Sequence, residues 1–190
     1  MTRVLLEPRP VLIPRTPVAG VGPLTTLFML NMVGDLRQAA GLVQGLPYGR
    51  THNRTDPALV LIEGQGTCSS KHACLAALGA ELGEDLGLTL GVYALSGETD
   101  PPVAPILAAA GLGWLPEAHC YLRLGEHRVD LTGGRREREV RLLHEESITP
   151  DQVGAYKETL HRRFIAERAA ELGCDAEGLW AIREACIAVL

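Results

Sequence analysis

Cys68, His119 and Asp130 are of the residue types, and in the chain order, that nucleophilic acyl chemistry can use. Cys68 lies in a turn of small residues, Gly64 to Ser70, that leads directly into the mostly apolar run Ala73 to Leu82. This pattern predicts a helix that begins next to Cys68, where unpaired backbone N–H groups and the positive end of the helix dipole stabilise a thiolate. Because the thiolate is the reactive form of cysteine, Cys68 occupies a position typical of a nucleophile.

The histidine and the carboxylate belong to a predicted β-hairpin. Residues 118–124 and 127–132 have the pattern of strands, and Gly125 followed by Glu126 suits a two-residue type II′ turn. Alternate residues of a strand share a face, so this turn makes His119 and Asp130 diagonal neighbours within side-chain reach. Cys120 points to the opposite, apolar face. A shift of one residue in the pairing would separate the His–Asp pair.

These positions allow a division of chemical roles. Cys68 would attack an acyl carbonyl as a thiolate, and His119 would deliver the proton to the leaving group. Asp130 would orient the imidazole and stabilise its charged form. The backbone N–H of Cys68 is a candidate oxyanion donor, and the Gln65 side chain, three residues earlier, is a second candidate.

With these residues, the sequence resembles the transglutaminase-like superfamily, within the wider papain-like cysteine-nucleophile fold. The resemblance implies an α+β fold, with a nucleophile-bearing helix packed on an antiparallel sheet and the thiol facing the histidine across a cleft. Known members include protein cross-linking enzymes, peptidases and amidases, and some have lost catalysis. The matching segments are Gly66-Thr67-Cys68, Glu117-Ala118-His119-Cys120-Tyr121 and Val129-Asp130-Leu131-Thr132.

The resemblance covers residues 58–133, and the sequence departs from the family at one point. Many relatives carry an aromatic residue next to the cysteine, where this chain has Ser69 and Ser70. Tyr121 does occupy the second place after His119, which makes it a candidate cleft residue. The resemblance therefore does not specify the acyl-donor pocket.

We expect residues 1–190 to form one domain with additional helices at both ends. Four prolines predict an extended arm over residues 1–22, and a capping box at Thr149 to Gln152 and a cap at Asp175 predict two helices over residues 149–189. The pattern further predicts helices over 23–43 and 67–82, a strand over 88–95, and either a strand or a helical lead-in over 58–62.

Composition restricts the partners. The net charge of −5 gives no basic field for nucleic acid, and the basic cluster 135–138 is interpreted as a solvated loop. The longest apolar run, residues 24–33, is too short to cross a bilayer. With no visible export signal, five cysteines indicate reduced thiols and a cytoplasmic protein.

Single residues outside the proposed chemistry are interpreted conservatively. We expect the four other cysteines to be buried or partly buried, Lys71 to be solvated, and four histidines to lie in surface or loop positions: His52, His127, His144 and His161. No cofactor or metal is predicted.

The leading hypothesis is cysteine-dependent hydrolysis, or transfer, of a small-molecule, peptide or protein acyl group. Hydrolysis is favoured because nothing in the sequence identifies an amine acceptor site. One alternative is a non-catalytic binding module whose arm and C-terminal helices are partner surfaces. A third is a zinc-dependent hydrolase with Cys68, His72, His119 and Asp130 as ligands, since His72 lies four residues after Cys68 on the same helical face. The sequence does not indicate an oligomeric state.

Overall fold

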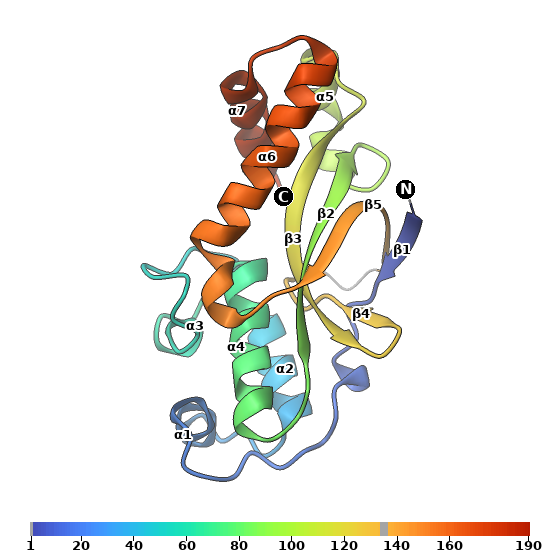
Figure 1. Cartoon of the computed structure of the whole chain (residues 1–190). Helices are drawn as coiled ribbons and strands as arrows, with labels where there is room; N and C mark the ends of the chain where they lie inside the picture. The colour runs from blue at the N-terminus through green and yellow to red at the C-terminus, as the bar shows by residue number, and fades with distance from the viewer. Residues whose placement is uncertain (1, 134–136) are drawn as a thin grey trace.

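The structure is a computed structural model that describes residues 2–133 and 137–190. At its centre is a five-stranded antiparallel sheet with the order β1-β5-β2-β3-β4, accompanied by seven described α-helices, and this confirms the predicted α+β class (Figure 1). The strands are β1 (Thr2–Leu6), β2 (Gly87–Ser96), β3 (Trp114–Leu124), β4 (His127–Val129) and β5 (Arg138–Ser147).

Helices cover both faces of the central strands. On one face, α4 packs its apolar residues against β2 and β3, and α1 and α2 lie around it (Figure 1). A second apolar cluster joins the sheet to α5 and α7 near the opposite end. Because both faces are covered, β2 is a nearly continuous buried run rather than an alternating one. The helices are α1 (Pro23–Leu30), α2 (Leu36–Gly45), α3 (Leu59–Ile62), α4 (Cys68–Glu81), α5 (Ala104–Ala109), α6 (Ala155–Leu172) and α7 (Ala176–Ile187).

The prediction of an extended arm over residues 1–22 is wrong for its first part. Residues 2–6 form β1, which pairs with β5 from Thr2↔Leu142 to Leu6↔Arg138. Neither strand was predicted, because an edge pairing between segments about 136 residues apart leaves no local sequence signal. The prolines all follow β1, and the first regular element among them is the short 3₁₀ turn Pro10–Leu12.

The single helix predicted over residues 23–43 is two helices. Pro23 does occupy the first turn of α1, but the chain leaves the helix at Asn31 and Met32 adopts a left-handed φ of 59°. Asp35 then starts α2, and its carboxylate accepts a hydrogen bond from the backbone N–H of Gln38. The ambiguous run at residues 58–62 is the short helix α3.

The predicted caps of the C-terminal helices are present. Thr149 and Gln152 form their capping box, although it first encloses the 3₁₀ turn Pro150–Val153, and α6 begins after Gly154. The Asp175 carboxylate caps α7 by accepting from the N–H of Gly178. Among the described residues, no helix combines the length and apolar character needed to cross a membrane.

Candidate active site

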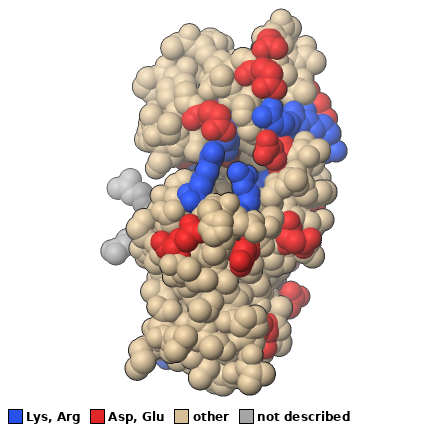
Figure 2. Space-filling view, turned by 90° about the vertical axis from the view of Figure 1, so that its left-hand side faces the viewer, with Lys and Arg blue, Asp and Glu red and all other residues tan. Residues whose placement is uncertain are grey.

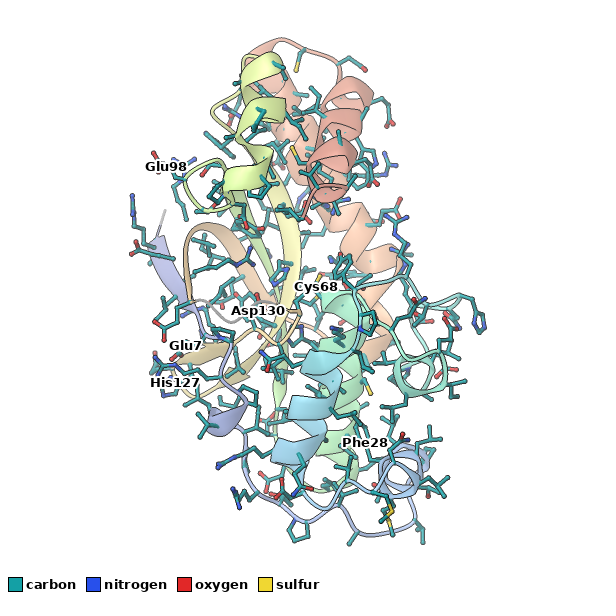
Figure 3. All side chains as sticks on the ribbon, turned by 180° about the vertical axis from the view of Figure 1, so that it is seen from behind. Glu7, Phe28, Cys68, Glu98, His127 and Asp130 are labelled. Atoms are coloured by element: carbon teal, nitrogen blue, oxygen red, sulfur yellow. The ribbon has the colours of Figure 1, made fainter. Side chains whose placement is uncertain are left out.

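Cys68 is the first residue of α4, as the sequence predicts. Thr67 is the N-cap, and Thr67 and Ser70 form a capping box that fixes the helix start. The Cys68 side chain is buried, with a residue exposure of 7%, yet it lines two cavities. Figure 3 shows Cys68 at the end of α4 that meets the middle of the sheet, and Asp130 lines one of the same cavities.

The hairpin has the predicted turn, and its pairing follows the predicted register as far as Val129, where β4 ends three residues before the predicted end of the strand. Leu124 pairs with His127, and the ladder continues to Leu122↔Val129. Gly125 has a φ of 56°, the positive value that the first central position of a type II′ turn requires. As a consequence, the His119 Nε2–H donates to Asp130 Oδ2 at 2.9 Å, and both residues are buried.

Asp130 is held as a carboxylate. Its Oδ1 accepts from the Thr132 hydroxyl at 2.6 Å and from the Thr132 N–H at 3.1 Å, and its Oδ2 also accepts from Arg138 Nη2 at 3.3 Å. Burial alone would raise the pKa of Asp130, but the charge and hydrogen bond of His119, together with the charge of Arg138, hold that pKa well below its usual value.

His119 is held as an imidazolium between two anions. Burial acts to lower the pKa of His119, but Asp130 and Cys68 outweigh it and raise that pKa to about 10. Because Nε2 is engaged by Asp130, Nδ1 is the ring nitrogen left for the thiol. Behind the ring, Tyr121 packs with ring centroids 6.4 Å apart, and its hydroxyl donates to Glu145 Oε1. Tyr121 lines neither of the cavities at Cys68 and therefore supports the histidine from behind.

Lys157 is the site residue that sequence reasoning missed. Its ammonium lies 3.6 Å from the Cys68 sulfur and donates to the Ser69 hydroxyl at 2.7 Å. Burial acts to raise the pKa of Cys68, but Lys157 first and His119 second overcome it and place the pKa well below that of an ordinary thiol. Lys157 lies in the first turn of α6, 89 residues after Cys68, so no local spacing could have linked the two.

His72 does not have the free ring nitrogen that the zinc alternative requires. Its Nδ1–H donates to the Cys68 carbonyl, and its Nε2 accepts the Leu131 N–H, both at 2.7 Å. Burial lowers the pKa of His72, which keeps the ring neutral as this bonding needs. Within residues 2–133 and 137–190, no three His, Cys, Asp or Glu side chains are grouped to hold a metal ion.

Two other expectations about polar residues near the site are corrected. Gln65 lines neither cavity, and its amide Nε2 donates to the Arg50 carbonyl, away from the proposed oxyanion role. Lys71 is fully buried rather than solvated, because its ammonium donates to the carbonyls of Leu46 at 2.6 Å and Thr132 at 2.7 Å. Lys71 thereby ties two loops beside the start of α4.

Three expectations further from Cys68 also need correction. His161 is buried, and its Nε2–H donates to the Pro116 carbonyl. Cys174 is exposed, whereas the other cysteines are buried. In the basic cluster, Arg135 and Arg136 lie outside the described residues, but Arg138 begins β5 and bonds to Asp100 and Asp130 instead of forming a solvated loop.

The two cavities meet at Cys68. The first, which we call the α6 cavity, measures about 340 Å³ and is bounded by the loop at residues 48–54 and by α6 and α7. Figure 2 shows a hollow on this side of the molecule with Lys and Arg side chains at its rim. The second, the His119 cavity, measures about 580 Å³ and extends past His119 and Asp130 towards Leu6 and Tyr93. Tyr48, Cys68, Glu117 and Ile187 line both.

Comparisons with known proteins give no relative: no family model, no curated protein and no solved structure matches this chain.

Proposed function

We propose that this protein is a cysteine-dependent acyl hydrolase or acyltransferase that forms a thioester on Cys68. The observation that carries the proposal is the environment of one sulfur. Cys68 lies at a helix N-terminus, next to the Lys157 ammonium and the His119–Asp130 pair, and it borders two cavities. A cysteine kept only for packing needs none of these charges.

The first half of the reaction begins with an imidazolium and a thiolate. The Cys68 thiolate attacks the acyl carbonyl carbon, and the carbonyl electron pair moves to oxygen. The Cys68 N–H and the Lys157 ammonium are the nearby donors for that oxyanion. When the intermediate collapses, the bond to the leaving group breaks, and the imidazolium gives that group its proton. The products are a Cys68 thioester, a neutral His119 and a protonated leaving group.

The second half reverses the proton transfer. Neutral His119 takes a proton from water or from an amine, which attacks the thioester carbonyl, and Cys68 leaves as a thiolate. Asp130 stabilises the imidazolium that forms again. We favour water as the acceptor, because no described feature marks an amine site.

The cavities favour this proposal over the non-catalytic binding module. A protein that had kept only the fold would be expected to have its cleft closed over the cysteine. Here Cys68 borders open volume on both sides.

The test is direct detection of the thioester. The protein is mixed with 4-nitrophenyl acetate, quenched in acid during turnover and analysed by intact mass and peptide mapping. We expect one acetyl group on Cys68, absent in Cys68→Ala, and slower acylation in His119→Ala. Cys174→Ala, the same change at an exposed thiol, serves as the matched control and should retain the adduct. Acylation of the wild type that is no faster at Cys68 than at Cys174 would contradict the proposal.

A further inference from the structure

Each cavity at Cys68 can be assigned to one part of the substrate. In the proposed reaction His119 gives its proton to the leaving group, so that group must lie beside His119. Only the His119 cavity is lined by His119. The rest of the acyl group extends from the same carbonyl carbon in another direction. The α6 cavity lies on the Lys157 side of Cys68.

The α6 cavity carries an excess of positive charge. It is lined by three carboxylates, and each has an arginine partner: Glu117 and Glu184 with Arg183, and Glu158 with Arg162. The basic side chains that line it number five: Arg50, Arg54, Lys157, Arg162 and Arg183. His161 adds no charge, because burial lowers its pKa.

Two of these cations have no carboxylate partner. Within residues 2–133 and 137–190, neither Arg54 nor Lys157 forms an ion pair with a carboxylate, and Lys157 donates instead to Ser69 and Cys68. The chain as a whole has a net charge of −5, so this local excess is opposite in sign to the rest of the molecule.

The His119 cavity has a different character. Leu6, Pro8, Tyr93 and Ile187 contribute apolar walls. Among the described residues that line it, the one arginine is Arg138, which is engaged by Asp100 at 2.6 Å and Asp130 at 3.3 Å. The described lining of this cavity therefore offers no unpaired arginine or lysine, and it suits an uncharged leaving group.

We infer that the acyl group transferred to Cys68 carries a carboxylate or phosphate, bound in the α6 cavity by Arg54 and Lys157, and that the leaving group is apolar. This inference rests on the proposed function, because it needs acyl transfer at Cys68, and it adds the class of substrate.

The test compares two alkylating agents that differ in charge. Iodoacetate carries a carboxylate and iodoacetamide does not, and both alkylate the same thiolate. We expect the ratio of the iodoacetate rate to the iodoacetamide rate to be higher at Cys68 than at the exposed Cys174 of the same protein. Arg54→Gln should lower the ratio at Cys68 about three- to tenfold, as expected for one charge removed near the reacting group. The iodoacetamide rate of each variant is the denominator of the ratio, so a change in the thiolate itself cancels.

Arg163→Gln is the matched control. Arg163 lies on α6 but does not line the cavity, and it pairs with Glu167 on the same helix, so its loss should leave the ratio unchanged. Glutarate and inorganic phosphate, tested separately as protectants against iodoacetamide, distinguish the two anion types, and Arg54→Gln should weaken whichever protection is seen.

The outcomes separate the two levels of the argument. Rapid alkylation of Cys68 by iodoacetamide, with no preference for iodoacetate and no effect of Arg54→Gln, would overturn the anionic acyl group and leave the thioester proposal intact. Alkylation of Cys68 by iodoacetamide no faster than that of Cys174 at mildly acidic pH would overturn both.

Discussion

Replacing Lys157 with methionine should raise the pKa of the Cys68 thiol by roughly one to four units. The ammonium lies 3.6 Å from the sulfur. At that distance two unit charges attract by about 1 kcal/mol at the dielectric constant of water and by about 5 kcal/mol at an effective value of 20. One pKa unit corresponds to about 1.4 kcal/mol, which gives the stated range. Methionine keeps much of the length of the side chain and removes the charge.

The assay is the rate of iodoacetamide labelling at Cys68 between pH 4 and pH 9, followed by peptide mass spectrometry. In the wild type the rate should stay nearly constant down to acidic pH, because His119 and Lys157 hold the thiol ionised. In Lys157→Met it should fall about tenfold per pH unit below the raised pKa. The exposed Cys174 supplies the reference thiol in each sample.

Lys157→Arg is the matched control, because it keeps a positive charge and should keep the wild-type titration. An unchanged titration midpoint in Lys157→Met would refute the reasoning, since the ammonium would then have no electrostatic effect on the sulfur. A parallel shift in Lys157→Arg would mean that packing, and not charge, sets the thiol's pKa.

The remaining predictions concern stability. Burial acts to lower the pKa of His119, but Asp130 and Cys68 raise it to about 10, above the value of about 6.5 in an unfolded chain. The imidazolium therefore contributes stability that is full below about pH 6.5 and is lost as pH rises through about 10, so the unfolding free energies of wild type and His119→Gln in urea should converge between pH 6 and pH 10. A difference in unfolding free energy between the two proteins that grows as the pH rises would contradict this prediction. Lys71→Met should lower the unfolding free energy by about 2–6 kcal/mol, since it leaves two carbonyls unpaired; a change below about 0.5 kcal/mol would be expected only of a solvated lysine.

Local rules identified the His–Asp pair from sequence. The turn at Gly125-Glu126 determines the register of the hairpin, and the register determines which side chains share a face. The capping signals at Thr149 and Asp175 also act within a few residues. Each of these inferences needed only neighbours in the chain, and each is confirmed in the structure.

The features that sequence reasoning missed depend on distant segments. Lys157 reaches Cys68 only because α6 crosses the sheet near the start of α4, and nothing within either segment encodes that approach. Lys71 was interpreted as solvated because a charged side chain on a helix usually is. Its partners are backbone carbonyls of two loops, which carry no residue-type signal.

The pairing of β1 with β5 also has a consequence for the order in which the protein matures during synthesis. β1 and β4 lie at opposite ends of the strand order, yet Glu7 connects them: its N–H donates to the Arg128 carbonyl, and its own carbonyl accepts the Asp130 N–H. The hydrogen bonds that pair β1 with β5 can therefore form only after residues 138–147 have been synthesised. At about 5–20 residues per second, a ribosome needs roughly 7 to 28 s to make the intervening chain. We expect the carboxylate behind His119 to be fixed late, after most of the polypeptide has been made.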